Sequence, residues 1–265
     1  MHQRAGQLAE PNDLVDIDAL LAAYYDVVPD VNNPDQKVVF GTSGHRGTST
    51  KGTFNEAHIV SITAAIVDYR KEQGTDGPLF MGADPHALSE PAWRTALEVL
   101  SAAGVDTYVD SRRSWTPTPA VSLAILEANG APDNLRQTGS GLADGIVITP
   151  SHNPPTDGGF KYNPPTGGPA QSGATSWIAA KANEYLAGPW RDVPRDRTSN
   201  PEKISHVKFY DFTTKYVEAL DTIIDFDAIR DAGVRIGADP MGGAAVDYWA
   251  AIGEHYGLDL TVVNP

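Results

Sequence analysis

The chain alternates short apolar runs with longer stretches in which apolar side chains recur every three or four residues. The short runs predict buried strands, and the longer stretches predict amphipathic helices. We expect strands at residues 37–40, 79–82, 105–109, 145–149, 234–238 and 258–263. We expect helices at residues 11–26, 55–71, 89–103, 118–128, 172–187, 209–220 and 243–256. This alternation predicts an α/β fold with three α/β/α layers around a mixed, mostly parallel sheet.

Two segments rich in proline and polar residues interrupt this alternation. Residues 154–170 are dense in Pro, Gly and Asn and predict an ordered loop. Residues 188–206 are polar and contain prolines, which is typical of a linker. The segment that follows Leu258–Val263, the last predicted strand, holds only two residues. A domain does not ordinarily end in this way, so we expect the chain to be a truncated fragment.

The interruptions divide the chain into three parts. We predict a first domain over residues 1–190, a linker over residues 191–206, and the incomplete start of a second, similar domain over residues 207–265. The first domain contains most of the residues that are suited to chemistry.

The composition excludes several functional classes. The chain has 34 Asp and Glu residues against 20 Lys and Arg, a formal net charge of −14, which gives no basic surface for nucleic acid. It has no cysteine, which excludes disulfides, thiolate nucleophiles and Cys-ligated zinc. No apolar run suits a membrane span or a signal peptide. We expect a soluble, cytoplasmic protein without nucleic-acid or membrane partners.

The segment Thr149-Pro150-Ser151-His152-Asn153-Pro154-Pro155 follows the strand predicted at 145–149. Ligands of doubly wound sheets bind beyond the carboxyl ends of the strands, and prolines stiffen this loop. An exposed serine on a rigid loop is suited to carry a group covalently, and the neighbouring histidine is suited to contact an anion. The alternative interpretation is a proline-rich turn without chemistry.

A glycine-rich segment, Gly41-Thr42-Ser43-Gly44-His45-Arg46-Gly47, opens directly after the strand predicted at 37–40. Its glycines allow positive φ angles and a backbone nest for an anion, and the guanidinium of Arg46 matches a phosphate. The segment matches neither a Walker A loop nor a dinucleotide fingerprint. The alternative is an ordinary connection with a solvated arginine.

Lys161 lies ten residues after Ser151, in Gly158-Gly159-Phe160-Lys161-Tyr162-Asn163. A connection of this length can fold back so that the lysine reaches the serine, although most lysines are simply exposed on a surface. Asp84-Pro85-His86 also follows a strand, but it is more typical of a turn. Arg112 and Arg113 are suited either to attract an anion or to be solvated.

Taken in this order and spacing, FGTSGHRG, TPSHNPP and GGFKYNPPTGGPA resemble the α-D-phosphohexomutase superfamily, and most of all its bacterial phosphoglucomutases. The resemblance covers residues 5–187 and continues through residues 236–243 into a second domain. It implies an enzyme that interconverts glucose 1-phosphate and glucose 6-phosphate through a phosphoserine and a glucose 1,6-bisphosphate intermediate, which also acts as an activator.

The resemblance also implies roles for individual residues. Ser151 matches the phosphoryl carrier, His152 and Arg46 match residues that contact phosphate, and Lys161 matches a lysine that transfers a proton. Further phosphate-binding residues are implied in the two loops, namely Thr42, Ser43, Gly44, His45 and Asn153. The family uses Mg²⁺, to which the phosphate oxygen on Ser151 would be one ligand.

Three features of the family are missing from these 265 residues. The carboxylate loop that completes the Mg²⁺ site is absent, as are the loops that recognise the sugar and its second phosphate. We therefore expect the chain alone to be inactive and to self-associate through apolar surface left exposed. A mutase for another hexose phosphate, and a phosphosugar-binding module without catalysis, remain as alternatives.

Overall fold

The computed structural model describes residues 4–41, 44–198, 200 and 203–264. The helices are α1 (Ile17–Asp26), α2 (Glu56–Gln73), α3 (Ser89–Ala102), α4 (Thr118–Ala128), α5 (Ser172–Ala187), α6 (Phe212–Ala219), α7 (Phe226–Asp231) and α8 (Val246–Tyr256). The strands are β1 (Gly44–Gly47), β2 (Leu79–Ala83), β3 (Thr107–Asp110), β4 (Asp144–Ile148), β5 (Gly158–Asn163), β6 (Val207–Tyr210), β7 (Ile236–Ala238) and β8 (Leu260–Val262).

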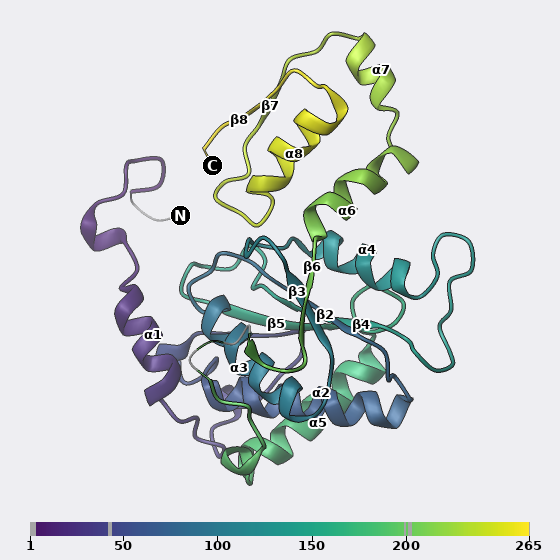
Figure 1. Ribbon diagram of the computed structural model, residues 1–265. Helices are drawn as coiled ribbons and strands as arrows, with labels where there is room; N and C mark the ends of the chain where they lie inside the picture. Colours follow the sequence, from purple (N-terminus) through teal and green to yellow (C-terminus); the bar gives the residue numbers. More distant parts are fainter. Residues whose placement is uncertain (1–3, 42–43, 199, 201–202, 265) are drawn as a thin grey trace.

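Six of these strands form one mixed sheet in the order β1-β5-β4-β2-β3-β6. The neighbours β4, β2, β3 and β6 are parallel, whereas β5 is antiparallel to both β4 and β1. Strand β4 lies in the middle and all five of its residues are buried, as its β-branched sequence predicts. Helices cover both faces, so the predicted three-layer fold is confirmed (Figure 1).

The two faces of the sheet bury separate cores. Helices α2, α3 and α5 cover one face, where Ile62, Leu97 and Ile178 are fully buried. Helix α4 covers the other face, and its Val121 and Ile125 pack against the sheet together with Phe212 of α6. Each large apolar side chain that is buried in this way stabilises the fold by about 1.5–3 kcal/mol.

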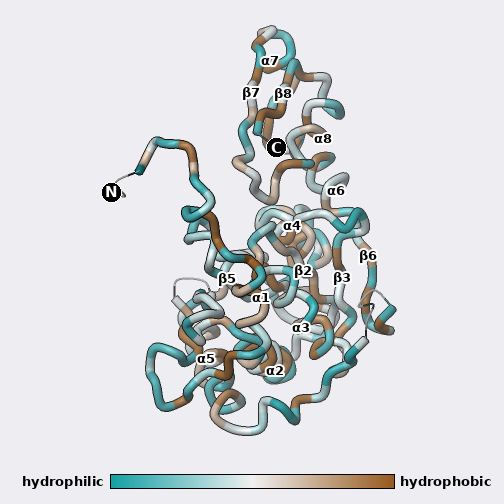
Figure 2. Tube along the Cα trace, turned by 90° about the vertical axis from the view of Figure 1, so that its left-hand side faces the viewer, coloured by the Kyte–Doolittle hydropathy of each residue, from teal (hydrophilic) through white to brown (hydrophobic). Residues whose placement is uncertain are grey.

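A smaller unit follows the large sheet. Strands β7 and β8 form a parallel pair next to α8, and this unit stands beyond α4 and α6 from the large sheet (Figure 2). Tyr248 of α8 is buried with the core on the α4 face, and Asp211 before α6 forms an ion pair with Arg112 at 3.0 Å. No helix in the part of the chain that the structure describes is long and apolar enough to cross a membrane.

The strand predicted at residues 37–40 is wrong. Only Phe40 forms a bridge, to His45, and the extended segment is Gly44–Gly47 itself. Residues Gly44–Gly47 thus form an edge strand, because each of them pairs with β5.

The ordered loop predicted at residues 154–170 contains a strand. Strand β5 occupies Gly158–Asn163, where Phe160 and Tyr162 are fully buried. Pairing on both sides, with β1 and β4, favours this strand despite the glycines and prolines around it.

The helix predicted from residue 209 begins at Phe212. The residues before it form β6, which pairs with β3 in the large sheet. Strand β6, which we assigned to the second domain, is therefore the edge strand of the first sheet. The other domain boundaries remain predictions.

The predicted linker is tied to the first sheet by a buried ion-pair network. Nη2 of Arg195 lies 2.7 Å from Oε1 of Glu56 and 2.6 Å from Oε2 of Glu98. Ser101 in α3 donates a further hydrogen bond to Asp196 at 2.6 Å. The segment before β6 is therefore packed against α2 and α3.

We predict that Arg195→Ala lowers the free energy of unfolding by about 3 kcal/mol, because it leaves the buried carboxylate of Glu98 without its cation. Urea denaturation measures the change. Arg197→Ala, at an exposed position of the same segment, is the matched control and should change the free energy by less than about 0.5 kcal/mol. Equal effects of the two variants would contradict a buried network.

Candidate functional site

The described residues that we predict to take part in chemistry lie near the carboxyl ends of the parallel strands of the large sheet. The parallel strands β4 and β2 end at Ile148 and Ala83, which are paired, so the loops that follow them leave the sheet side by side. The first loop carries Ser151 and the second carries Asp84, whose backbone N–H donates to the carbonyl of Ile148 at 3.0 Å. This edge is where α/β sheets bind ligands.

Ser151 is exposed and has a φ of 68°. A side chain other than glycine in this region is strained, and such strain concentrates at functional sites. The Ser151 N–H donates to Oγ1 of Thr149 at 2.9 Å, and Oγ of Ser151 lies 3.4 Å from Nδ1 of His152. The loop therefore fixes its backbone while it presents both the hydroxyl and the imidazole to solvent.

Asn153 stabilises this loop from within. Its Nδ2 donates to Oδ2 of Asp157 at 3.0 Å. The amide that the family resemblance assigns to phosphate binding is thus engaged with the loop's own carboxylate. In this structure Asn153 positions the loop.

Two adjacent glycines bring β5 under the serine loop. A Cβ on Gly158 would overlap the ring of Phe54, and a Cβ on Gly159 would overlap the backbone of Thr149 and Pro150. Because neither residue has a side chain, β5 returns directly along β4 and pairs Lys161 with Val147. The chain therefore folds back along the strand that leads into Ser151, and the expectation that Lys161 reaches the serine stays a prediction.

The antiparallel return also places Lys161 next to β1. Gly44 is paired with Lys161, and a Cβ on Gly44 would overlap both Phe160 and the Lys161 side chain. Neither Gly41 nor Gly47 has a positive φ. The glycines of this segment therefore permit close approach between strands, and the predicted anion nest of positive-φ glycines is wrong at these positions.

Lys161 is half-buried, and its side chain makes no hydrogen bond or ion pair with any residue that the structure describes. Loss of hydration lowers the pKa of its ammonium group, and the nearby charge of Arg46 lowers it further, while Asp84 opposes the shift. Arg46 is exposed on β1. An unpaired lysine whose pKa is depressed by burial and by a second cation is suited to accept a proton.

The prediction that His45 binds phosphate is wrong. His45 is 2% exposed, with Nε2 at 2.8 Å from the carbonyl of Thr53 and Nδ1 at 3.3 Å from the backbone of Val39. It stacks between Phe54 and His58. Burial lowers the pKa of its imidazole, so His45 is a neutral core residue behind β1 and does not face a ligand. Thr42 and Ser43, the other polar residues of this loop, lie outside the described residues.

Asp84 is an additional candidate residue, which the sequence did not distinguish from a turn. It is 8% exposed and accepts hydrogen bonds from Oγ of Ser89 at 2.7 Å and from Nδ1 of His86 at 2.9 Å. The charge of Asp84 opposes the lowering of the Lys161 pKa. The only sequence signal was a carboxylate directly after a buried strand.

The described residues contain no group of three or more His, Asp or Glu side chains that could hold a metal ion. Ser151 would offer one phosphate oxygen once phosphorylated, which is too few donors for Mg²⁺. The residues at hand therefore do not fit a complete magnesium site.

A comparison with protein families matches residues 37–187 to the phosphoglucomutase/phosphomannomutase alpha/beta/alpha domain I. The chain belongs to the phosphoglucomutase/phosphomannomutase family. The matched range contains the Ser151 loop, Arg46 and Lys161, so the resemblance drawn from these motifs is confirmed.

Similar proteins include a phosphoglucomutase of Komagataeibacter xylinus, 51% identical over 98% of this chain and 46% of that protein. A cytoplasmic phosphoglucomutase of Mesembryanthemum crystallinum is 34% identical over 57% of this chain and 27% of its own length. The chain thus spans about half the length, or less, of the curated relatives it matches.

The open form of parafusin, a phosphoglucomutase from Paramecium, has the same fold, with a TM-score of 0.65 and 23% identity. That match covers 88% of this chain and 44% of the Paramecium chain. A phosphoglucomutase/phosphomannomutase family protein of Burkholderia thailandensis matches 84% of this chain and 43% of its own, with a TM-score of 0.60 and 21% identity.

We predict that Gly159→Ala destabilises the protein by about 1–3 kcal/mol, because the added methyl group displaces the Thr149–Pro150 backbone. Urea denaturation measures the change. Gly168→Ala is the matched control, since nothing lies within 4 Å of its Cβ position and its φ is not positive. The contact between β5 and the loop would be refuted by equal stability of the two variants.

A second prediction concerns the stacked imidazoles. Burial, and to a lesser extent the neighbouring imidazole of His45, lowers the pKa of His58 from 6.5 to about 3. Between these values the unfolded chain binds a proton that the folded protein does not. The contribution of His58 to the free energy of unfolding is therefore fully present above about pH 6.5. Below that pH it falls by up to about 1.4 kcal/mol per pH unit.

His58→Gln should reduce this pH dependence of the unfolding free energy by up to one proton. His152→Gln, at an exposed position, is the control and should leave it unchanged. The same slope in both variants between pH 6.5 and about 4 would show that His58 does not titrate with a depressed pKa.

Proposed function

We propose that this chain is the phosphoryl-carrying part of a phosphoglucomutase, in which Ser151 alternates between its free and phosphorylated forms. The observation that carries the proposal is the strained, exposed Ser151 at the carboxyl end of β4, with Lys161 and Arg46 on the two strands that follow across the sheet. The identity to the Komagataeibacter phosphoglucomutase supports it.

The proposed covalent step transfers a phosphoryl group to Ser151. Oγ of Ser151 attacks a phosphorus of glucose 1,6-bisphosphate, a new Oγ–P bond forms, and the bond from that phosphorus to the sugar oxygen breaks. The serine proton passes to a base, which returns it to the departing sugar oxygen, so that this oxygen leaves as a hydroxyl. In the reverse direction the phosphoserine gives its phosphoryl group to the other hydroxyl of a hexose monophosphate.

Lys161 is the base that we propose for the serine proton. An ammonium group cannot accept a proton, so a lysine base must be neutral for part of the time. The depressed pKa of Lys161, caused by burial and by Arg46, increases that neutral fraction. Once protonated, Lys161 adds a positive charge next to the phosphoryl group.

Arg46 and His152 are the groups that we propose to offset phosphate charge. Arg46 is exposed beside Lys161, and His152 follows the serine directly. Preorganised donors of this kind act on the charge that develops during transfer. His45 takes no part, because its ring is buried and bonded to backbone.

We further propose that Mg²⁺ assists in the complete enzyme, with the phosphate oxygen on Ser151 as one ligand. Its carboxylate ligands, and the groups that select the sugar, would come from polypeptide outside these residues, since the relatives are about twice as long. Glucose phosphate is the proposed substrate, another hexose phosphate is the alternative, and the cytoplasm is the proposed location.

The first test is labelling of Ser151. Incubation with ³²P-labelled glucose 1,6-bisphosphate and Mg²⁺, followed by peptide mapping, should place the label on Ser151, while turnover of glucose 1-phosphate by these 265 residues stays negligible. Ser151→Ala should abolish labelling, whereas Ser140→Ala, at an exposed loop position, should not. Label on another residue, or binding of the sugar phosphate without any label, would contradict the proposal.

The same assay tests the base. Lys161→Met should slow labelling by about 10²–10⁴-fold, the usual contribution of general acid–base catalysis. Lys208→Met, exposed on β6, is the matched control and should label at the original rate. An unchanged rate in Lys161→Met would remove Lys161 from the mechanism and leave the serine carrier standing.

A further inference from the structure

A separate pocket of about 220 Å³ opens at the same edge of the sheet, between the carboxyl ends of β2 and β3. We call it the aromatic pocket. It is lined by Met81, Ala83, Glu90, Trp93, Val109, Asp110, Arg113, Ser114, Trp115, Thr116 and Phe209. Neither Ser151 nor Lys161 is among these residues, so the pocket is distinct from the phosphoryl site.

The topology explains why a pocket forms there. Strand β2 leads into α3 on one face of the sheet, and β3 leads into α4 on the other face. The two loops therefore diverge, and the crevice between such loops is the position where open α/β sheets bind ligands. The carboxyl ends of β2 and β3 are the switch point of this sheet.

The pocket has unusually exposed aromatic walls. Trp115 is 40% exposed and Phe209 is 49% exposed, and neither packs into a hydrophobic core cluster. Trp93 forms another wall and is partly buried against the core. Pockets for drug-sized ligands measure about 300–1,000 Å³, so this smaller pocket is suited to a single ring.

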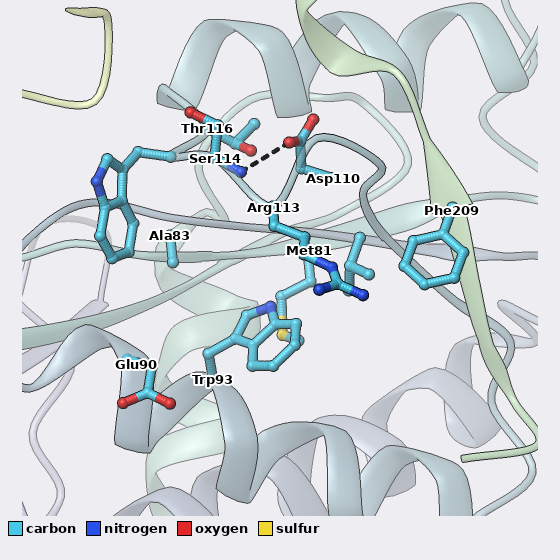
Figure 3. Close-up of a pocket in the computed structure, with 11 residues that line it drawn as sticks. Met81, Ala83, Glu90, Trp93, Asp110, Arg113, Ser114, Thr116 and Phe209 are labelled. Atoms are coloured by element: carbon cyan, nitrogen blue, oxygen red, sulfur yellow. Dashed lines mark hydrogen bonds between the residues drawn. The ribbon is translucent and has the colours of Figure 1, made fainter. Parts of the chain in front are cut away.

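Polar groups stand among these rings. Figure 3 shows the guanidinium of Arg113 between the rings of Trp93 and Phe209. Glu90 and Asp110 also line the pocket, and Asp110 fixes the loop by accepting a hydrogen bond from the Ser114 N–H at 2.9 Å. Arg113 itself has a φ of 57°, a strained conformation that the loop maintains next to the pocket.

The charges of the lining select against an anion. One guanidinium is outnumbered by two carboxylates, so a phosphorylated ligand would gain one attraction and meet two repulsions. A ring with apolar faces and hydroxyl groups at its edge is suited to contact both the aromatic and the charged residues of the lining. Its faces stack on the aromatic rings, and its hydroxyls donate to carboxylates and accept from the guanidinium.

We propose that the aromatic pocket binds a neutral hexopyranose ring, as a second carbohydrate site independent of the phosphoserine. This inference does not rest on the proposed function, because it uses none of the residues of the Ser151 site. The site would recognise an unphosphorylated sugar or the end of a glycan.

The test is a titration of the protein with methyl α-D-glucopyranoside, followed through the indole N–H signals of its five tryptophans by NMR. We expect the signals of Trp93 and Trp115 to shift and saturate at about millimolar concentration. Trp249 on α8 is not among the residues that line the pocket, so it is the internal control and should shift less.

Two exposed positions provide variants that retain the core. Trp115→Ala and Phe209→Ala should each weaken binding at least fivefold, measured through the Trp93 signal, while Trp249→Ala should leave it unchanged. Three results would overturn the proposal. They are the lack of any saturable shift, equal shifts at Trp249, and tighter binding of glucose 1-phosphate than of the neutral glycoside in this pocket.

Discussion

The close approach of β5 to the end of β4 is the constraint on which the candidate site depends. Gly159 lies against the backbone of Thr149 and Pro150, and Gly44 lies against Lys161. A side chain at either position would force the strands or the serine loop apart. Because both are glycines, β5 lies close beside β4 and β1 lies close beside β5, which places Lys161 and Arg46 on the two strands next to the one that leads into Ser151.

The basic side chains of the protein differ in charge and in role because their surroundings differ. His45 and His58 are buried, bonded to backbone and held neutral, so they stabilise the packing behind β1. Lys161 is only half-buried, and its side chain has no hydrogen-bond or ion-pair partner among the described residues. With its pKa depressed, this side chain is suited to exchange a proton. Arg195 is buried as well, but two carboxylates keep it charged and tie the segment before β6 to α2 and α3.

The sequence predicts those parts of the fold in which local pattern and tertiary context agree. Helices α2, α3, α4 and α5 and the buried strands β2, β3 and β4 follow from apolar periodicity and lie within two residues of their expected ends. Strands β1 and β5 do not follow from it, because their glycines have low strand propensity and pairing in the sheet, of β1 with β5 and of β5 with β4, makes them extended.

The site shows the same division. The position of Ser151 beyond a buried strand follows from the sequence pattern, whereas the position of Lys161 in strand β5 does not. Other features of the site depend on the folded conformation and are not visible in the sequence pattern. They are the burial of His45, the hydrogen bonds that hold Asp84 and the hydrogen bond between Asn153 and Asp157.

The central claim is that Ser151 carries a phosphoryl group, and the most direct measurement is made on protein purified from its own cells. Mass spectrometry of the intact protein and of its peptides locates any phosphate. We predict a phosphate on Ser151 that passes to added glucose 1-phosphate and gives glucose 1,6-bisphosphate. A bare Ser151 in every preparation, or a phosphate only at other positions, would contradict it.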